Sequence, residues 1–292
     1  MAELHEIEVT AAGWRADKLI AEALPELSRS AVQNLIRDGH VTCDNKIVQK
    51  SAKLAPGSVL CVEIPEARPL DVKAENIPLD IRYEDDDLII VNKPAGMVVH
   101  PGHGNYTGTL VNALTYHLKD LPLFQSGDMR AGLVHRIDKN TSGILVIAKN
   151  ERAHARLAKQ FFDHSIDRVY HALVWGNMES DEGTVTGNIG RSLRDRMKMA
   201  VFPDGESGKH AVTHYRVLER LGYVNLVECR LETGRTHQIR VQFASRGLPL
   251  LGDGKYGSRC GRCTCALWSY RLTLCLPGGK TETFTAKPPE RF

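Results

Sequence analysis

The stretch GLVHRIDKNTSGILVIA, residues 132–148, places a polar loop directly before an apolar run. The run from Gly143 to Ala148 is apolar and rich in β-branched residues, which predicts a buried strand. The loop carries His135, Arg136 and Asp138, and loops of this kind are where a rigid scaffold presents reactive side chains. The stretch therefore predicts a sheet-based domain with a reactive loop at one strand end.

The rest of the second half of the chain combines helical patterns with many short strands. Leu110–Leu118 and Glu151–Phe162 carry apolar residues at helical spacing, and Asn150 is a suitable N-cap for the second helix. Further strands are predicted at 88–91, 169–174, 211–218, 224–231, 267–274 and 281–286. Few helices among many strands indicate an α+β class.

The composition of the 292 residues is that of an ordinary globular protein, with 42% hydrophobic and 25% charged residues. The net charge of +3 excludes a polybasic tail protein but permits local basic surfaces. The first residues lack a basic segment followed by an apolar run, and no stretch approaches the roughly 18 apolar residues of a membrane span. We therefore expect a cytoplasmic protein without membrane contact, whose seven cysteines are mostly scattered, reduced thiols.

The first segment, from about Trp14 to Pro65, has the pattern of a small unit with two helices and short strands. Polar and basic residues gather in or beside its helices and the following hairpin, and the candidate RNA contacts among them are Arg15, Lys18, Ser28, Arg29, Arg37 and Lys46. Basic side chains on a small rigid unit suit phosphate contacts, which give affinity without reading sequence. An ordinary solvated surface is the alternative interpretation.

The order of short motifs favours RNA binding over a solvated surface. The segment contains RADKL at 15–19, LSRS at 27–30, LIRDGHV at 35–41, NK at 45–46 and PG at 56–57. Together they resemble the αL RNA-binding module first described in ribosomal small-subunit protein S-four. The resemblance implies binding to structured RNA, and not catalysis by itself. We place this module at residues 13–72 and expect a linker region at 73–80.

Four polar pieces stand out in the second part of the chain: NKPAG at 92–96, the loop at 132–143, RVYHALV at 168–174 and TGRTHQIR at 233–240. Each alone has an ordinary interpretation. Asp138 could cap a loop, Tyr170 could fill a core, and Arg235 could be a surface charge at a helix start, where a cation is unfavourable without an anionic partner. His135 and His237 lack a metal-binding spacing and are interpreted as structural hydrogen-bonding residues.

Together these pieces resemble the RluA-type pseudouridine synthases, most closely their RluD-like ribosomal large-subunit branch. Other matching stretches are VHPG at 99–102, GTLVNAL at 108–114, IGR at 189–191, KMAV at 198–201, and GD with YG within 252–257. The resemblance runs from about Tyr83 to the C-terminus, and an αL module before this domain is the usual layout of the family. It implies a catalytic domain at 81–292, built on a large mixed, mostly antiparallel β-sheet with flanking helices.

The resemblance implies that uridine is isomerised to pseudouridine, which breaks a C–N glycosidic bond and forms a C–C bond at the same sugar carbon. The reaction needs no redox change and no external group, so neither a cofactor nor a metal is expected. Asp138 matches the essential carboxylate of the family, and it acts either as a nucleophile or as a base. Arg235 matches the arginine that pairs with it and stabilises its charge. Tyr170 matches the aromatic residue that stacks on the target base and is a candidate base late in the reaction.

Three further residues are expected to contact substrate: Arg136, His135 and Ile239. Arg136 matches the residue that enters the RNA helix where the target uridine has flipped out. The expected partner is RNA, above all ribosomal RNA, free or within a pre-ribosomal particle, and the enzyme is expected to be a monomer.

Two features depart from the family pattern. Gln242 stands where the family usually has histidine, and both residues can donate hydrogen bonds. Cys260, Cys263 and Cys265 form a cluster in a loop that varies in the family. A zinc site with a fourth ligand such as Cys275 or a histidine is one interpretation of the cluster, and unpaired reduced thiols are the other.

Two other functions are alternatives to the isomerase. A noncatalytic RNA-binding or ribosome-assembly factor would not need Asp138, Tyr170 and Arg235 together. A nucleotide or glycosidic hydrolase would normally use a second carboxylate for acid–base catalysis, and none of these motifs supplies one beside Asp138. A small-molecule enzyme would also have no use for the αL module.

Overall fold

The computed structural model describes residues 3–25, 27, 29–44, 46–49, 52–64, 72–102, 104–125, 130–203, 205, 207–257 and 264–289, without the side chains of residues 3, 29 and 30. The chain divides into two compact units, Met1–Pro69 and Leu70–Phe292. Each unit has its own hydrophobic core and is described by itself.

The first unit packs two helices on a small sheet. Its elements are β1 (Glu3–Glu8), α1 (Ala16–Ala23), α2 (Arg29–Arg37), β2 (Val41–Cys43), β3 (Lys46–Ile47) and β4 (Val59–Ile64), with the strand order β1-β4-β2-β3. The two helices and the last strand confirm the sequence pattern. Strand β1 was not predicted, and it pairs antiparallel with β4 ahead of residue 13, where the module was expected to begin. The side chains of residues 4–8 are half-buried or exposed, so the apolar alternation of the strand is weak.

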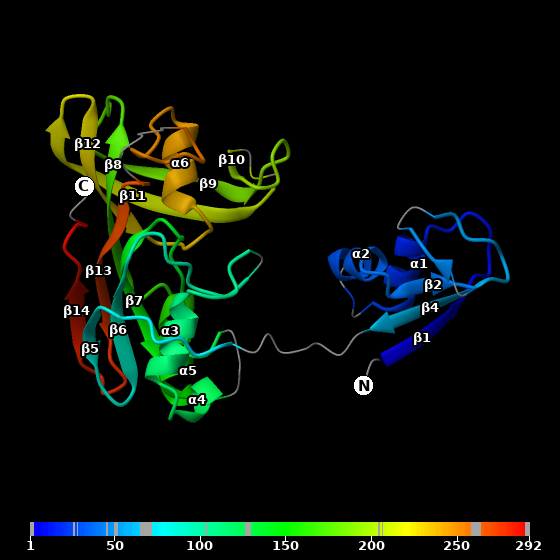
Figure 1. The fold of residues 1–292 in the computed structure, drawn as a ribbon. Helices are drawn as coiled ribbons and strands as arrows, with labels where there is room; N and C mark the ends of the chain where they lie inside the picture. Colours follow the sequence, from blue (N-terminus) through cyan, green and yellow to red (C-terminus); the bar gives the residue numbers. More distant parts are fainter. Residues whose placement is uncertain are drawn as a thin grey trace. The chain divides into compact units, whose positions relative to one another are not determined.

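The second unit is built on one ten-stranded sheet (Figure 1). Its elements are β5 (Ile81–Glu84), β6 (Leu88–Lys93), α3 (Leu110–His117), α4 (Pro122–Gln125), β7 (Ser142–Ala148), α5 (Glu151–Phe162), β8 (Asp167–Trp175), β9 (Glu182–Arg191), β10 (Met199–Phe202), β11 (Lys209–Leu221), β12 (Val224–Leu231), α6 (Gln238–Ser245), β13 (Leu267–Cys275) and β14 (Thr281–Thr285). The order is β10-β9-β11-β12-β8-β13-β7-β6-β5, with β14 beside β13. The β7–β13 pair is parallel and the other described pairs are antiparallel. This confirms the predicted α+β class and mixed, mostly antiparallel sheet.

Strands β6 and β7 are covered on both faces, which makes their loops well supported. One face packs with Leu110 and Leu114 of α3, and the other packs with Ala153 and Leu157 of α5. Asn150 caps α5 as predicted, because its side chain accepts a hydrogen bond from the N–H of Ala153 at 2.9 Å. Each fully buried aliphatic side chain contributes roughly 1.5–3 kcal/mol to stability. The reactive loop therefore enters a rigid strand.

Residues 73–80, which were expected to form a linker region, pack on the second unit. The side-chain amide of Asn112 donates to the carbonyl of Lys73 at 2.8 Å, and the N–H of Asn92 donates to the carbonyl of Asp80 at 2.8 Å. Leu79 also contacts the main core. Extended backbone held through such bonds has no hydrophobic periodicity, so its sequence looks like a linker.

Gly143 lies where β7 approaches β13 most closely, and its replacement is expected to disrupt the sheet. Its φ is +111°, and a Cβ there would lie 2.2 Å from the carbonyl oxygen of Ser269. We expect Gly143→Ala to cost at least about 2 kcal/mol, because backbone strain adds to the clash. The free energy of unfolding in urea measures this. Gly278→Ala, where a Cβ meets nothing within 4 Å, is the control, and equal stability of the two variants would contradict the expectation.

Candidate active site

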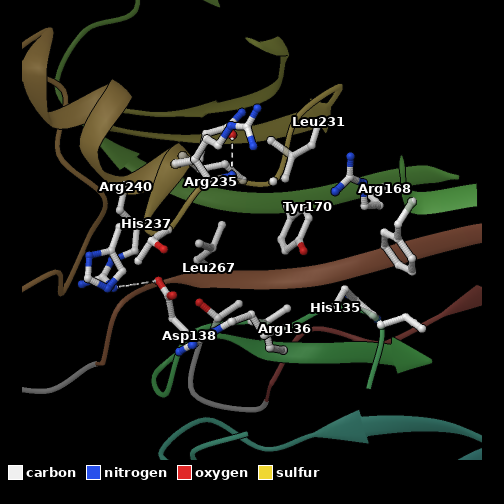
Figure 2. A pocket seen from close by; sticks show the side chains of 18 of the residues that line it. His135, Arg136, Asp138, Arg168, Tyr170, Leu231, Arg235, His237, Arg240 and Leu267 are labelled. Carbon is white, nitrogen blue, oxygen red and sulfur yellow. Dashed lines mark hydrogen bonds and ion pairs between the residues drawn. The ribbon is translucent and has the colours of Figure 1, made fainter. Parts of the chain in front are cut away.

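A pocket of about 560 Å³ lies between the reactive loop, the end of α5, strand β8, the turn before α6 and strand β13. In Figure 2, Asp138 and Arg136 lie on one side of it, Tyr170 in its middle and Arg168 at its far end. Pockets of roughly 300–1,000 Å³ enclose small molecules. The fold thus gathers polar side chains from distant parts of the chain around one cavity.

The loop that carries Asp138 is held by the NKPAG turn. The side chain of Lys93 is buried, and its Nζ donates to the carbonyl oxygens of Pro94, Met97 and Lys139, at 2.7, 2.8 and 3.2 Å. Burial lowers the pKa of Lys93 to about 7, although the charge of Asp138 favours the protonated form. Lys93 therefore fastens the backbone next to Asp138.

Asp138 is ion-paired with an arginine that is itself clamped. Nη1 of Arg240 donates to Oδ2 of Asp138 at 2.8 Å, while its Nε and Nη2 donate to the two carboxylate oxygens of Asp253 at 2.8 and 2.9 Å. Burial disfavours the charged guanidinium, but the hydrogen bonds and charge of Asp253 raise the pKa of Arg240. A bidentate pair fixes direction as well as charge, so Arg240 holds Asp138 in one orientation.

A histidine with an unusual backbone also faces Asp138. His237 has a φ of +56°, and its Nε2 lies 3.9 Å from Oδ2 of Asp138. Its Nδ1 lies 2.6 Å from the hydroxyl of Tyr256, which accepts a hydrogen bond from the N–H of Met199 at 2.9 Å. Because the Tyr256 hydroxyl already accepts that N–H, it can donate its own proton in a hydrogen bond to Nδ1 of His237. Nδ1 is then the unprotonated nitrogen, and the imidazole proton is on Nε2, which faces Asp138. Burial lowers the pKa of His237 to about 4, although Asp138 opposes the shift, so the ring is neutral.

Residues 87–245 match the model of the RNA pseudouridylate synthase family, and residues 14–60 match that of the S4 domain. The first match covers more than half of the chain, and it includes the Asp138 loop and its Arg240 partner. This chain belongs to the RNA pseudouridylate synthase family. The S4 match confirms the predicted αL module.

Relatives and solved structures agree with this family. The chain is 50% identical over 247 residues to the ribosomal large subunit pseudouridine synthase D of Zymomonas mobilis, covering 84% of this chain and 77% of the relative. It is 48% identical over 260 residues to an uncharacterized RNA pseudouridine synthase of Bacillus subtilis, covering 88% and 84%. The structure of human RNA pseudouridylate synthase domain containing 1 superposes with a TM-score of 0.60 at 25% identity, covering 74% of this chain and 86% of that chain.

In this synthase the arginine beside Asp138 differs from the one expected. Arg240 forms the ion pair, whereas Nε of Arg235 donates to the carbonyl oxygen of His210 at 2.9 Å. The expected pairing of Asp138 with Arg235 is therefore wrong. Arg235 precedes α6 and its Nε bonds to a carbonyl of β11. His237 is the N-cap of α6 and Arg240 lies three residues further on, in the first turn, and both side chains face Asp138. That spacing, with the GD motif that supplies Asp253, was a usable signal in the sequence.

Tyr170 lies in the pocket as expected. It comes from β8, is 7% exposed, and shares the main core with Ala172 and Val174, which were predicted to lie on its face of the strand. Burial raises the pKa of its phenol, so the hydroxyl keeps its proton at neutral pH. The ring thus forms part of the wall in the middle of the pocket (Figure 2).

The three expected substrate contacts all line the pocket, with different surroundings. His135 accepts a hydrogen bond from the N–H of Val146 at 3.0 Å and stacks on Phe161 with centroids 4.6 Å apart. Burial and the nearby Arg168 charge lower the pKa of His135 to about 3, so this ring is a neutral part of the wall. Arg136 is exposed, and Ile239 is buried at the start of α6.

Two further pocket residues, Arg168 and His237, were quoted in motifs but, like Arg240, received no functional role from the sequence. Arg168 is only 8% exposed, its Nη2 donates to the carbonyl of Glu232 at 2.9 Å, and its guanidinium lies 5.7 Å from the ring centroid of Phe161. Its position two residues before Tyr170 on one strand was the available signal, because alternate residues share a face.

Gln242, which departs from the family pattern, fixes α6 to the sheet. It is fully buried, accepts a hydrogen bond from Thr213 at 2.7 Å, and donates to the carbonyl of Val185 at 3.1 Å. Gln242 therefore helps to set the helix that carries Arg240.

The cysteine cluster is only partly described. Cys260 and Cys263 lie outside the described residues, and Cys265 is buried in the main core, where burial raises the pKa of its thiol. Among the described residues, no group of three metal-ligating side chains occurs. No helix in the described ranges is both long and apolar enough to cross a membrane.

The candidate RNA contacts of the first unit are exposed where they are described. Arg15 and Arg37 are ion-paired with their neighbours Asp17 and Asp38, at 2.8 and 2.9 Å. Lys18 and Lys46 are exposed. Ser28 and the side chain of Arg29 lie outside the described residues.

Proposed function

We propose that this protein isomerises uridines of large-subunit ribosomal RNA to pseudouridine, with Asp138 as the essential carboxylate and without a cofactor. The observation that carries the proposal is the Asp138–Arg240 ion pair at the pocket of a chain in this family. Relatives named ribosomal large subunit pseudouridine synthase D, 41–50% identical, support ribosomal RNA as the substrate.

The geometry of Asp138 fits either proposed role of its carboxylate. Arg240 and His237 both approach Oδ2, so Oδ1 is the oxygen that would reach the ribose. It would attack C1′ as a nucleophile or remove a ribose proton as a base. In the net reaction the N1–C1′ bond breaks and a C5–C1′ bond forms. C5 loses its proton, and N1 gains a proton.

The other pocket residues have proposed roles that follow from their burial. Tyr170 would stack on the uracil while the base rotates, and its raised pKa favours this role over that of a base. Exposed Arg136 would occupy the space left in the RNA helix by the flipped uridine. His135 and Ile239 would form the wall against the nucleotide.

A noncatalytic RNA-binding factor remains the rival function, and the site argues against it. A clamped arginine and a buried lysine both act on the orientation of Asp138 and its loop. A protein that only binds RNA would gain nothing from that arrangement. The cytoplasm as the location and a monomer as the active form remain predictions from the sequence.

The test is to incubate the full chain with large-subunit ribosomal RNA transcripts and transfer RNA transcripts, and to map pseudouridine by carbodiimide treatment and primer extension. We expect modification at a few defined uridines of the ribosomal transcript. A wild-type protein that modifies no transcript would overturn the proposed enzymatic function. Modification of transfer RNA alone would overturn ribosomal RNA as the proposed substrate.

Lys18 and Lys46 provide a test of the first unit. Each is expected to contact one phosphate, so the double variant Lys18→Gln/Lys46→Gln should bind RNA more weakly, with a salt dependence shallower by about one to two units of the log–log slope. Filter binding at several salt concentrations measures this. The single-turnover rate at saturating enzyme is the control and should not change. A slope equal to that of wild type would show that these side chains face solvent only.

A further inference from the structure

The side of the pocket opposite Asp138 carries positive charge that no carboxylate of the described residues balances (Figure 2). Arg168 and Arg235 both line the pocket. Among the described residues, neither has a carboxylate within 4.0 Å of its side-chain nitrogens, in contrast to Arg240, which has two. A buried cation normally has an anionic partner, because burial without one is costly.

The hydrogen bonds of Arg168 do not compensate for its burial. Its contacts among the described residues are the neutral carbonyl of Glu232 and the face of Phe161, and its buried Nε has no partner there. The carboxylate of Glu232 is held elsewhere, 2.5 Å from Nε2 of His214. Arg168 thus keeps donor capacity that a ligand in the pocket can use.

The chain also makes room for this guanidinium beside Arg235. A Cβ at Gly234 would lie 2.8 Å from Nη1 of Arg168, so a glycine lets that nitrogen lie against the turn. Arg235 follows directly. Burial lowers the pKa of Arg168 most, Tyr170 raises it, and the charge of Arg235 lowers it further. Two like charges held together in one wall are unfavourable without an anion between them.

We propose that Arg168 and Arg235 form a phosphate subsite, which binds a phosphate flanking the target uridine while Asp138 faces its ribose. In Figure 2, Arg168 lies at the far end of the pocket from Asp138, Tyr170 lies between these two residues, and Arg235 lies on the opposite side of the pocket from Asp138. Neither Arg168 nor Arg235 has a carboxylate partner among the described residues, whereas Arg240 is shared by the carboxylates of Asp138 and Asp253. A nucleotide has matching parts, namely a ribose, a base and an anionic phosphate. This rests on the proposed function, because it takes the pocket as the site of the flipped uridine.

The test compares uridine with uridine 5′-monophosphate and uridine 3′-monophosphate, by calorimetric titration of the full chain. We expect at least one monophosphate to bind about tenfold more tightly than uridine, as one charge-assisted contact would give. Arg168→Met should reduce this ratio toward one. Gly234→Ala should do the same while keeping the charge, because it displaces Nη1. Arg246→Met, which removes an exposed arginine that does not line the pocket, is the matched control and should keep the ratio.

Three results would overturn the phosphate subsite: uridine binding as tightly as both monophosphates, Arg168→Met keeping the ratio, or Arg246→Met losing it equally. Thermal melting shows whether the Arg168→Met variant is folded. If it is not folded, the affinity ratio of Gly234→Ala decides whether the subsite exists. The measurement needs no turnover. An inactive wild type that still prefers a monophosphate therefore overturns only the proposed function, and an active wild type without the preference overturns only the subsite.

Discussion

Asp138→Asn is expected to abolish pseudouridine formation while the protein still folds and binds RNA. Whether Asp138 attacks C1′ or removes a proton, the amide can do neither, so the single-turnover rate should fall about 10⁴-fold or more. Asparagine has nearly the same shape, and Arg240 keeps its bidentate partner Asp253. We therefore expect the free energy of unfolding to change by only about 1 kcal/mol.

The Asp138 measurement is a single-turnover time course on the mapped ribosomal transcript, with RNA affinity measured in parallel. Asp86→Asn, an exposed carboxylate away from the pocket, is the control for charge and should behave as wild type. Activity of Asp138→Asn within tenfold of wild type would show that the Asp138 carboxylate is not essential for the reaction. Loss of RNA binding together with activity would instead indicate a folding defect, which circular dichroism and melting detect.

The second large effect is expected at Arg240. Arg240→Lys keeps the charge but loses the planar fork that joins Asp138 to Asp253, so one ammonium must serve two carboxylates. We expect the maximal rate to fall about 100-fold, because the carboxylate is no longer held in its reactive orientation. Affinity for RNA should change little, since the guanidinium is 8% exposed and engaged by these two carboxylates.

Arg235→Lys is the matched variant, because it makes the same change at the arginine that the sequence placed beside Asp138. We expect its maximal rate to stay within a few-fold of wild type, with any effect appearing in the affinity for RNA. The reverse result, a slow Arg235→Lys and a normal Arg240→Lys, would mean that the ion pair of this structure is not the active arrangement. Because Asp253 is buried, urea unfolding of both variants accompanies the kinetics.

Local patterns predicted most of the elements around the site. Helix α5 has the predicted bounds, Glu151–Phe162, because its own residues give both the apolar face and the Asn150 cap. Strand β7 was visible because it is buried on both faces and therefore continuously apolar. The sequence did not predict strand β1, because its pairing with the distant strand β4 holds it in place. It also did not predict that residues 73–80 pack on the second unit, because hydrogen bonds from distant residues hold their backbone.

The site was predicted in part, and the error at Arg235 has a definite cause. Two arginines lie five positions apart in TGRTHQIR, and both have the right chemistry for a carboxylate. The start of α6 decides between them, because it turns His237 and Arg240 toward Asp138 and leaves Arg235 bonded to His210. Helix boundaries are the least certain part of a pattern-based prediction.

The sequence by itself determined the chemical groups and the family. Short stretches of sequence contain the carboxylate loop before an apolar strand, the aromatic residue on a strand and the arginine-containing turn. A family model matches the region that holds all three. Tertiary structure alone decided which arginine holds Asp138 and which are left without a carboxylate. Those outcomes depend on distances between residues up to 102 positions apart, and folding sets such distances through packing of whole elements.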